Sequence, residues 1–323
     1  MKLKYQEESI LFPKAPFSFD PSLHKPDHFS SQDTFWNTGI RWQTMLWQGI
    51  PLGLKLENKG TVNQPKIKLT VFSSKKLSYQ FIDSLIKEIN YRYDLETDLS
   101  EFTKKFEKDK QLGPVIKKWP GMRVISPQSL YEYLIIGAVL QNCTVKRSVN
   151  MMQVLFEEYG RKVEFDSQKF FCFWEPKTLL KASEEKLRAL KVGYRAKSLL
   201  KISQPFAEKE IDEQKLRQEG REKQRETLIS LYGVGPATVG YLLFDVFKHY
   251  DGLNHISPWE QKIYSKLFFK TDPEKPVSVE KLLVLFKKRY GLYQMLAIHY
   301  IWEDLWWKRK NESLPWLEKL IRL

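Results

Sequence analysis

The chain has 323 residues, with 53 Lys and Arg against 39 Asp and Glu, which gives a formal net charge of +14 at pH 7. Its 42% hydrophobic and 14% aromatic content excludes a disordered basic tail and is enough to fill a core. With only two cysteines, Cys143 and Cys172, a disulfide scaffold and a four-cysteine zinc or iron–sulfur site are excluded. A folded basic protein remains, and its charge points to a polyanionic partner.

Membrane and secretion signals are weak. The most apolar stretch, Leu134–Leu140, predicts a buried helical turn and is too short for a membrane span. Glu7 and Glu8 stand where a signal peptide would need an apolar core. No basic amphipathic helix with a large apolar face supports a membrane-surface protein. We therefore expect a cytoplasmic location.

The N-terminal part of the chain, from about residue 17 to 72, predicts an antiparallel sheet. Apolar and other residues alternate with a period of two over residues 40–49, 52–57 and 66–72, with turns near Gly49 and Gly60. After Ser78, apolar residues four apart predict one face of a helix at Phe81, Leu85, Ile89 and Tyr93. Helical patterns then dominate to the C-terminus, which predicts two mostly α-helical subdomains, and the charged run 207–226 predicts a solvated helix face or a loop.

We thus expect an α+β fold in three parts: residues 1–115 as an antiparallel sheet subdomain with a helix, 116–225 as a helical subdomain, and 226–323 as a helical hairpin with C-terminal helices. Residues 225–243 carry the hairpin, with a turn at Gly233, Val234 and Gly235 and a helix that starts at Pro236. The free N–H groups of such a helix start bind a phosphate without reading a base. A dinucleotide fingerprint would need a preceding strand and a third glycine. The alternative is a helix–turn–helix with a purely structural role.

This hairpin and further motifs in the same order resemble the helix-hairpin-helix (HhH-GPD) DNA glycosylase superfamily, which includes 3-methyladenine and 8-oxoguanine DNA glycosylases. The resemblance spans roughly residues 17–306 and is carried by residues 231–243, Tyr93–Leu95, Pro120–Arg123, Gln141–Val145, Gly193–Lys197, Gly291–Gln294 and His299–Trp302. It implies a sheet followed by two helical subdomains with a lesion pocket between them. It also implies base flipping and, as partner, double-stranded DNA with a damaged base, bound by a monomer.

The resemblance assigns DNA contacts to the hairpin and to two turns. Asn142 would fill the gap left by the flipped base, and Tyr194 would press on neighbouring bases. Arg195 and Lys197 would neutralise phosphates, as would the hairpin residues Gly233, Val234, Gly235, Ala237 and Thr238. From the residues alone, Asn142 is equally well a turn residue ahead of the helix N-cap Thr144. Arg195 and Lys197 have an alternative too, because a Lys or Arg on a helix surface is more often only solvated.

The predicted base pocket consists of Gln294, Trp259 and Ile298. Gln294 would hydrogen-bond a base edge, although an exposed polar position on an amphipathic helix is the alternative. The cluster of Trp302, Trp306 and Trp307 predicts core or a subdomain interface rather than a base platform.

The catalytic carboxylate is not where the family places it. Ser257 stands at the family's Asp position, and Glu260 follows one helical turn later on the same face. A capping box, Ser257 with Glu260 around Pro258, is the structural alternative, and Asp251 is a third candidate acid. The position of the Schiff-base lysine in bifunctional members is Ala237, which predicts a monofunctional enzyme that uses water. His255 beside the site would carry a proton or contact a phosphate, or be structural.

The leading hypothesis is a monofunctional DNA glycosylase of base excision repair that excises an alkylated or oxidised purine. The alternative, motivated by Ser257, is a lesion- or structure-specific DNA-binding protein without excision. No cofactor is required and no iron–sulfur cluster is expected. A monovalent cation at the hairpin carbonyls of Ile229, Leu231 and Val234 is implied by the resemblance. In a prokaryote the protein would associate with the nucleoid.

Overall fold

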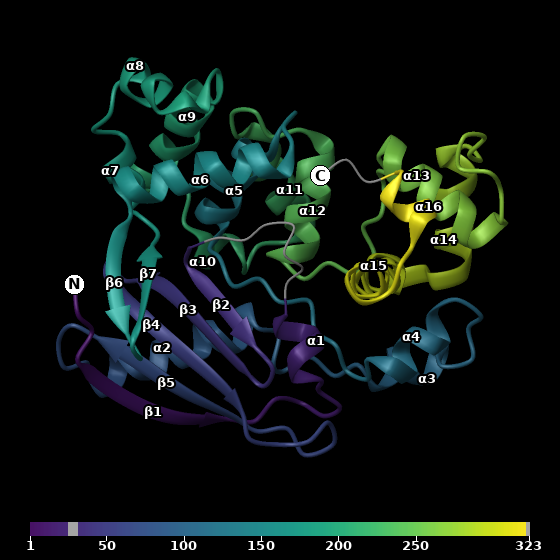
Figure 1. Ribbon diagram of the computed structural model, residues 1–323, viewed down its shortest axis with the longest axis horizontal. Helices are drawn as coiled ribbons and strands as arrows, with labels where there is room; N and C mark the ends of the chain where they lie inside the picture. The colour runs from purple at the N-terminus through teal and green to yellow at the C-terminus, as the bar shows by residue number, and fades with distance from the viewer. Residues whose placement is uncertain (25–31, 321–323) are drawn as a thin grey trace.

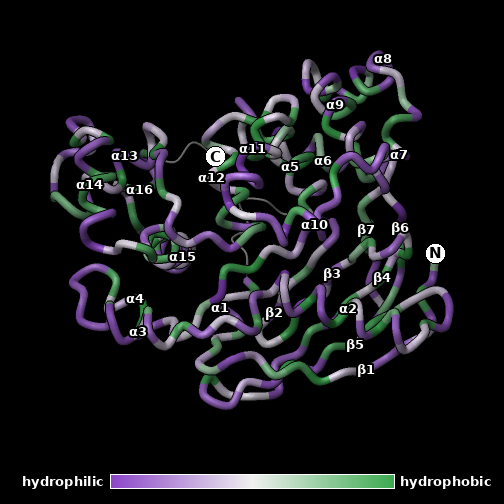
Figure 2. Tube along the Cα trace, turned by 180° about the vertical axis from the view of Figure 1, so that it is seen from behind, coloured by the Kyte–Doolittle hydropathy of each residue, from purple (hydrophilic) through white to green (hydrophobic). Residues whose placement is uncertain are grey.

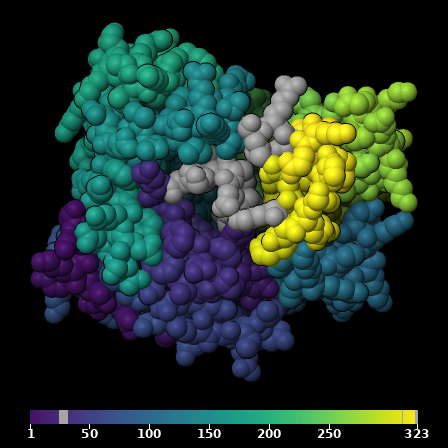
Figure 3. All heavy atoms as spheres, in the orientation of Figure 1, coloured from purple at the N-terminus to yellow at the C-terminus, as the bar shows by residue number. Residues whose placement is uncertain are grey.

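A computed structural model describes residues 1–24 and 32–320. An N-terminal sheet forms one side of the molecule, and two groups of helices lie against it (Figure 1). In the space-filling view, the sheet residues and the first helices occupy the lower part, with the later helices above and to the right (Figure 3). The predicted α+β class is therefore confirmed.

The sheet has five antiparallel strands in the order β1-β5-β4-β3-β2. They are β1 Tyr5–Leu11, β2 Thr34–Asn37, β3 Ile40–Trp47, β4 Ile50–Asn58 and β5 Ile67–Ser73. Gln48 and Gly49 both have positive φ and join β3 to β4 by a two-residue turn, as hairpin twist requires. The three predicted strands are confirmed, whereas β1 and β2 were not predicted. Within the region predicted as strands, Phe19–Leu23 is the short helix α1, and residues 25–31 lie outside the described residues.

Helix α2, Tyr79–Arg92, confirms the predicted four-residue spacing and packs Leu85 and Ile89 against the sheet. In Figure 2, hydrophobic and hydrophilic residues alternate along the strands, and hydrophobic residues also occur in the helices above them. The helices that follow up to residue 230 are α3 Ser100–Phe106, α4 Leu112–Lys118, α5 Leu130–Leu140, α6 Val145–Tyr159, α7 Pro176–Leu179, α8 Glu184–Leu187, the π-helix η2 Arg188–Val192, α9 Arg195–Ala207, α10 Glu213–Leu216 and α11 Arg221–Ser230. The C-terminal ones are α12 Pro236–Asp245, α13 Pro258–Tyr264, the π-helix η3 Ser265–Phe269, α14 Val279–Tyr290, the 3₁₀-helix η4 Gly291–Tyr293, α15 Gln294–Asn311 and α16 Pro315–Glu318.

A β-hairpin that was not predicted interrupts the mostly helical part of the chain. Strands β6, Arg161–Phe165, and β7, Gln168–Cys172, pair with each other and lie across the sheet. The Thr44 hydroxyl donates to the Phe171 carbonyl at 2.8 Å. Gly53 lets the Phe165 ring lie on the sheet, because a Cβ there would be 2.5 Å from the ring. Contacts distant in sequence, rather than local periodicity, hold this hairpin.

Most residues of the charged run 207–226 are exposed, as predicted, but Arg217 is an exception. The Arg217 side chain is only 8% exposed and pairs with Glu88 of α2 at 2.7 Å. Its guanidinium also lies 4.0 Å from the centre of the Tyr91 ring. The run therefore fastens α10 to the sheet layer through a buried ion pair.

Three large cores lie between these layers. One is formed by the sheet and α2, one by α5 to α12, and one by residues 99–124 together with residues 244–317. The division at residues 115 and 225 stays a prediction, and residues 99–115 pack with the C-terminal helices. In the described ranges, no helix is both long and apolar enough to cross a membrane.

Candidate active site

Helices α12 and α13 bring three side chains to the wall of one pocket. Ala237 and Tyr241 are four residues apart on α12, so they share a face of the helix. Glu260 joins them from the first turn of α13. The pocket holds about 400 Å³ with its open mouth included, and its other lining residues are Gly240, Gly252, Leu253, Asn254, His255, Tyr264, Met295 and Ile298.

The Glu260 carboxylate is the best-connected group of this pocket. Its Oε2 accepts hydrogen bonds from the Ser257 N–H at 2.9 Å and from the Ser257 hydroxyl at 2.6 Å. The Tyr241 hydroxyl donates to Oε1 at 3.2 Å and to Oε2 at 3.3 Å. Glu260 is only 9% exposed. The two interpretations of Glu260 are therefore compatible, because the contact that caps α13 also holds the carboxylate at the pocket wall.

Tyr241 is a hydrogen-bond donor at neutral pH. Burial, with the charge of Glu260 and its hydrogen bond, raises the pKa of the phenol well above its usual range. Its side chain is nevertheless 46% exposed, as the wall of an open pocket would be. Tyr241 was not among the predicted site residues, although its four-residue spacing from Ala237 places both on one face of α12.

Asp251 and Gln294 lie behind the pocket and do not line it. The Arg221 guanidinium donates to both Asp251 carboxylate oxygens at 2.8 Å. The Gln294 side-chain amide donates to the Asp251 carbonyl at 2.5 Å, and Gln294 is 8% exposed rather than an exposed surface residue. These contacts hold the loop that leads to Ser257. Asp251 and Gln294 therefore have a structural position next to the pocket.

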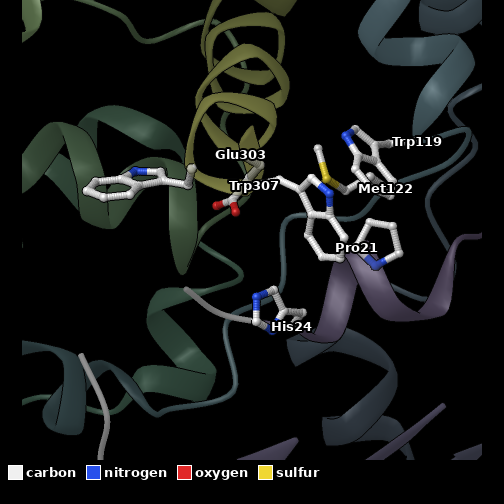
Figure 4. A pocket seen from close by; sticks show the side chains of 7 residues that line it. Pro21, His24, Trp119, Met122, Glu303 and Trp307 are labelled. Carbon is white, nitrogen blue, oxygen red and sulfur yellow. The ribbon is translucent and has the colours of Figure 1, made fainter. Parts of the chain in front are cut away.

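The predicted apolar pocket residues and the tryptophan cluster lie in three different places. Ile298 lines the pocket, whereas Trp259 is half-exposed and packs edge-on against Trp302, with ring centres 5.1 Å apart. Trp306 and Trp307 line a separate hollow between α1 and α15, shown in Figure 4, together with Pro21, His24, Trp119, Met122 and Glu303. The interface interpretation fits this part of the tryptophan cluster, because α1 and α15 come from opposite ends of the chain.

The hairpin turn has the geometry of an open anion site. Gly233 has φ +75°, and the Val234 N–H closes the turn on the Leu231 carbonyl at 3.1 Å. Gly235 is the N-cap of α12, and a Cβ added there would meet nothing within 4 Å. Ala237 and Thr238 follow in the first turn of α12, both half-buried. Free N–H groups and the helix dipole face this open space.

Gln141 joins the hairpin to the other two predicted DNA-contact segments. Its side-chain amide donates to the Gly233 carbonyl at 3.1 Å. The Arg195 guanidinium donates to the Gln141 carbonyl, which the Tyr194 hydroxyl also approaches at 3.5 Å. Asn142 follows in an exposed turn with φ +49°. The segments at 141–142, 194–195 and 233–235 thus meet on one side of the molecule, through a residue that the sequence analysis did not single out.

Among the predicted phosphate-binding cations, only Lys197 faces solvent. Arg195 is 3% exposed and holds the Gln141 turn, whereas Lys197 is exposed, with its Nζ 5.8 Å from the centre of the Tyr232 ring. Tyr194 and Tyr232 are both about half exposed beside it. Thr144 caps α6 by accepting the Arg147 N–H at 3.4 Å, as its N-cap interpretation requires.

Carboxylate, thiol and imidazole clusters suited to a metal ion are absent from residues 1–24 and 32–320, where no three such groups converge. The donor set that the family resemblance assigns to a monovalent cation is different and consists of the uncharged carbonyl oxygens of Ile229, Leu231 and Val234. Such oxygens suit a hard monovalent cation better than a transition metal.

Known proteins resemble this chain in sequence and in fold. The profile of the HhH-GPD superfamily of base excision DNA repair proteins matches residues 136–314. A DNA-3-methyladenine glycosylase of Bacillus subtilis (strain 168) is 23% identical over 189 residues, which are 55% of this chain and 62%, less than two thirds, of that protein.

Solved structures share the fold at low identity. A 3-methyladenine DNA-glycosylase from Archaeoglobus fulgidus superposes with a TM-score of 0.73 at 16% identity, over 95% of this chain and 99% of that one. The Clostridium acetobutylicum 8-oxoguanine glycosylase/lyase, in complex with double-stranded DNA containing cytosine opposite 8-oxoG, gives 0.68 at 17% identity, over 96% and 99%. At such identities the likeness establishes the fold alone.

Proposed function

Because the chain belongs to the HhH-GPD superfamily of base excision DNA repair proteins, we propose that it is a DNA N-glycosylase that hydrolyses the N-glycosidic bond of a damaged purine. The family supports the class of enzyme, and the residues of the site support the details of the reaction. The main observation behind these details is that Ser257 holds the Glu260 carboxylate at the wall of the pocket.

In the proposed reaction the damaged nucleotide leaves the base stack and its base enters the pocket. As the bond from C1′ to the base nitrogen lengthens, positive charge develops on the sugar, and the negative charge of Glu260 stabilises it. Water then forms the new bond to C1′ and gives up a proton, while the base leaves with the bonding electrons. Ala237 offers no amine to attack C1′, which supports hydrolysis by a monofunctional enzyme.

The pocket favours an alkylated purine over an oxidised one. Glu260 and the ring of Tyr241 stand on the same wall. A purine methylated on a ring nitrogen carries positive charge, which a carboxylate and an aromatic face both attract. An oxidised neutral purine gains less from either group. We therefore place alkylated purines first among the candidate lesions.

Duplex DNA would bind across the face where the three segments joined by Gln141 meet. The N–H groups at the start of α12 and the Lys197 ammonium would contact phosphates, while Tyr194 and Asn142 would meet the bases around the gap. The relative from Clostridium acetobutylicum is named with double-stranded DNA, which agrees with this partner. We propose that the protein acts as a cytoplasmic monomer, which in a prokaryote would associate with the nucleoid.

A monovalent cation at the hairpin would be held by the carbonyls of Ile229, Leu231 and Val234. The Leu231 carbonyl accepts the Val234 N–H, so the turn is already closed without an ion. The cation would add positive charge beside the phosphate-binding N–H groups. Replacing K⁺ by tetramethylammonium at constant ionic strength should then weaken binding to undamaged duplex several-fold, and equal affinity would contradict the cation site.

The experiment that tests the proposed function is a single-turnover screen over duplexes that carry one 7-methylguanine, 3-methyladenine, 8-oxoguanine or hypoxanthine. We expect an abasic product and free base for at least one alkylated purine, without strand cleavage before alkali. If no lesion yields an abasic product, the alternative holds, namely a DNA-binding protein without excision activity. Excision gained by Ser257→Asp in an inactive parent would also support that alternative.

A further inference from the structure

We propose that Tyr241 is a positioning residue that fixes the plane of the Glu260 carboxylate toward the bound sugar. This inference rests on the proposed function of Glu260 and assigns a role to a residue that the family resemblance did not supply. Tyr241 acts through Glu260, and its ring also forms part of the pocket wall.

The two carboxylate oxygens of Glu260 are held unequally. Both Ser257 donors, the N–H at 2.9 Å and the hydroxyl at 2.6 Å, reach Oε2. Among the described residues, the only hydrogen bond to Oε1 comes from the Tyr241 hydroxyl at 3.2 Å. The terminal torsion of a glutamate is broad, so anchoring one oxygen leaves the other free to swing. Tyr241 therefore supplies the second anchor that defines the carboxylate plane.

Helix capping does not require this contact. Ser257 and Glu260 close the N-terminus of α13 between themselves, and Tyr241 comes from another helix, α12. Its side chain is half exposed at the pocket rather than packed in a core. The Tyr241 hydroxyl contacts both oxygens of the Glu260 carboxylate from the pocket, so it can orient the carboxylate there.

The phenol is suited to this task at all ordinary pH values. It keeps its proton, because burial and the charge of Glu260 raise its pKa. The phenol thus stays a hydrogen-bond donor beside the carboxylate. Transition-state charge is stabilised best by groups that need no reorganisation during the reaction.

The test compares binding to two abasic-site analogues in duplex DNA, a cationic pyrrolidine and a neutral tetrahydrofuran. Their affinity ratio reports how well the site stabilises positive charge at the sugar and needs no turnover. The proteins are the wild type, Tyr241→Phe, Glu260→Gln and the double variant. Tyr159→Phe is the control, because it removes a buried hydroxyl that has no hydrogen-bond partner among the described residues and lies on α6.

We expect Tyr241→Phe to lower the ratio about five- to tenfold, as for the loss of one hydrogen bond to a charged group. Its affinity for the tetrahydrofuran duplex should stay unchanged. In the Glu260→Gln background the same change should have no further effect, because the two residues act as a unit. A wild-type ratio in Tyr241→Phe, or a loss that persists without the Glu260 carboxylate, would overturn the proposal.

The outcomes separate this inference from the proposed function. If Glu260→Gln keeps the wild-type ratio, the carboxylate does not stabilise the sugar, and the proposed mechanism fails together with the role of Tyr241. If Glu260→Gln abolishes the preference and Tyr241→Phe does not reduce it, the mechanism stands and only the positioning role is wrong. Thermal melting of each variant verifies that it is folded.

Discussion

The Ser257 hydroxyl donates to the Glu260 carboxylate at 2.6 Å, so the residue at the family's acid position holds the acid that follows it. The serine is thus more than the loss of a carboxylate. Its helix cap also positions the longer side chain of Glu260, which reaches the pocket from the first turn of α13.

Ser257→Ala should destabilise the protein by about 1–2 kcal/mol, because Glu260 loses a charge-assisted hydrogen bond. Excision should fall as well, since Oε2 then keeps only the Ser257 N–H and the Tyr241 contact. The control is Ser278→Ala, which removes the N-cap of α14 away from the pocket. That variant should lose comparable stability in urea unfolding and keep the wild-type excision rate; equal rates in both variants would contradict the role of Ser257.

The two hairpin glycines should respond differently to alanine. Gly233 has φ +75°, so Gly233→Ala should cost about 1–2 kcal/mol of folding stability. Gly235 has φ −96° and open space around it, so Gly235→Ala should fold normally. Its methyl group would instead occupy the space proposed for a phosphate and weaken binding to undamaged duplex. Equal affinity of Gly235→Ala and wild type would argue against a phosphate at this turn.

Salt dependence should distinguish Lys197 from other surface cations. If Lys197 contacts one phosphate, Lys197→Gln should reduce the slope of log K against log salt by about 0.9. Lys275→Gln removes the same charge from an exposed loop between α13 and α14 and should leave the slope nearly unchanged. Titrations of a fluorescent duplex over a range of KCl concentrations measure both slopes, and identical slopes for the two variants would refute the assignment.

Acid should lower the free energy of unfolding, because it protonates the Glu88 carboxylate. Burial alone would raise the pKa of this carboxyl, but Arg92 and Arg217 outweigh burial and lower it to about 2. Because the folded pKa lies below the unfolded value of 4.5, the stabilisation is present above pH 4.5 and is lost as pH falls toward 2. The loss should approach roughly 3 kcal/mol.

The free energy of unfolding against pH checks this account of acid sensitivity. Glu88→Gln should be several kcal/mol less stable at pH 7, because two buried arginines lose their partner, and it should lose less between pH 4.5 and 2. Glu208→Gln changes an exposed glutamate and should keep the wild-type pH dependence. A wild-type acid slope in Glu88→Gln would show that other carboxyl groups cause the loss.

The elements that the sequence predicted well are those fixed by local pattern. Alternation defined β3, β4 and β5, the four-residue spacing defined α2, and Gly233 with Pro236 defined the hairpin. The hairpin β6–β7 escaped prediction, because its Phe165 and Phe171 depend on Gly53 and Thr44, more than a hundred residues earlier.

The contacts of the candidate site also fall into those that a local sequence pattern predicts and those that depend on tertiary packing. The pairing of Ser257 with Glu260 was visible as a capping box, since both residues lie within four positions. The approach of Tyr241 to Glu260, the burial of Gln294 against Asp251 and the inward turn of Arg195 depend on how helices pack. Periodicity gives the face of a helix but does not identify what that face meets.

The proposed function requires the Glu260 carboxylate for base excision. This requirement can be tested by comparing the single-turnover excision of 7-methylguanine from a duplex by the wild type and by Glu260→Gln. Thermal melting and DNA affinity show that both proteins are folded and bind the duplex. We predict an abasic product with the wild type and a rate at least about 100-fold lower with Glu260→Gln, in the range lost when a group that stabilises transition-state charge is removed. Equal rates in the two proteins would contradict the claim.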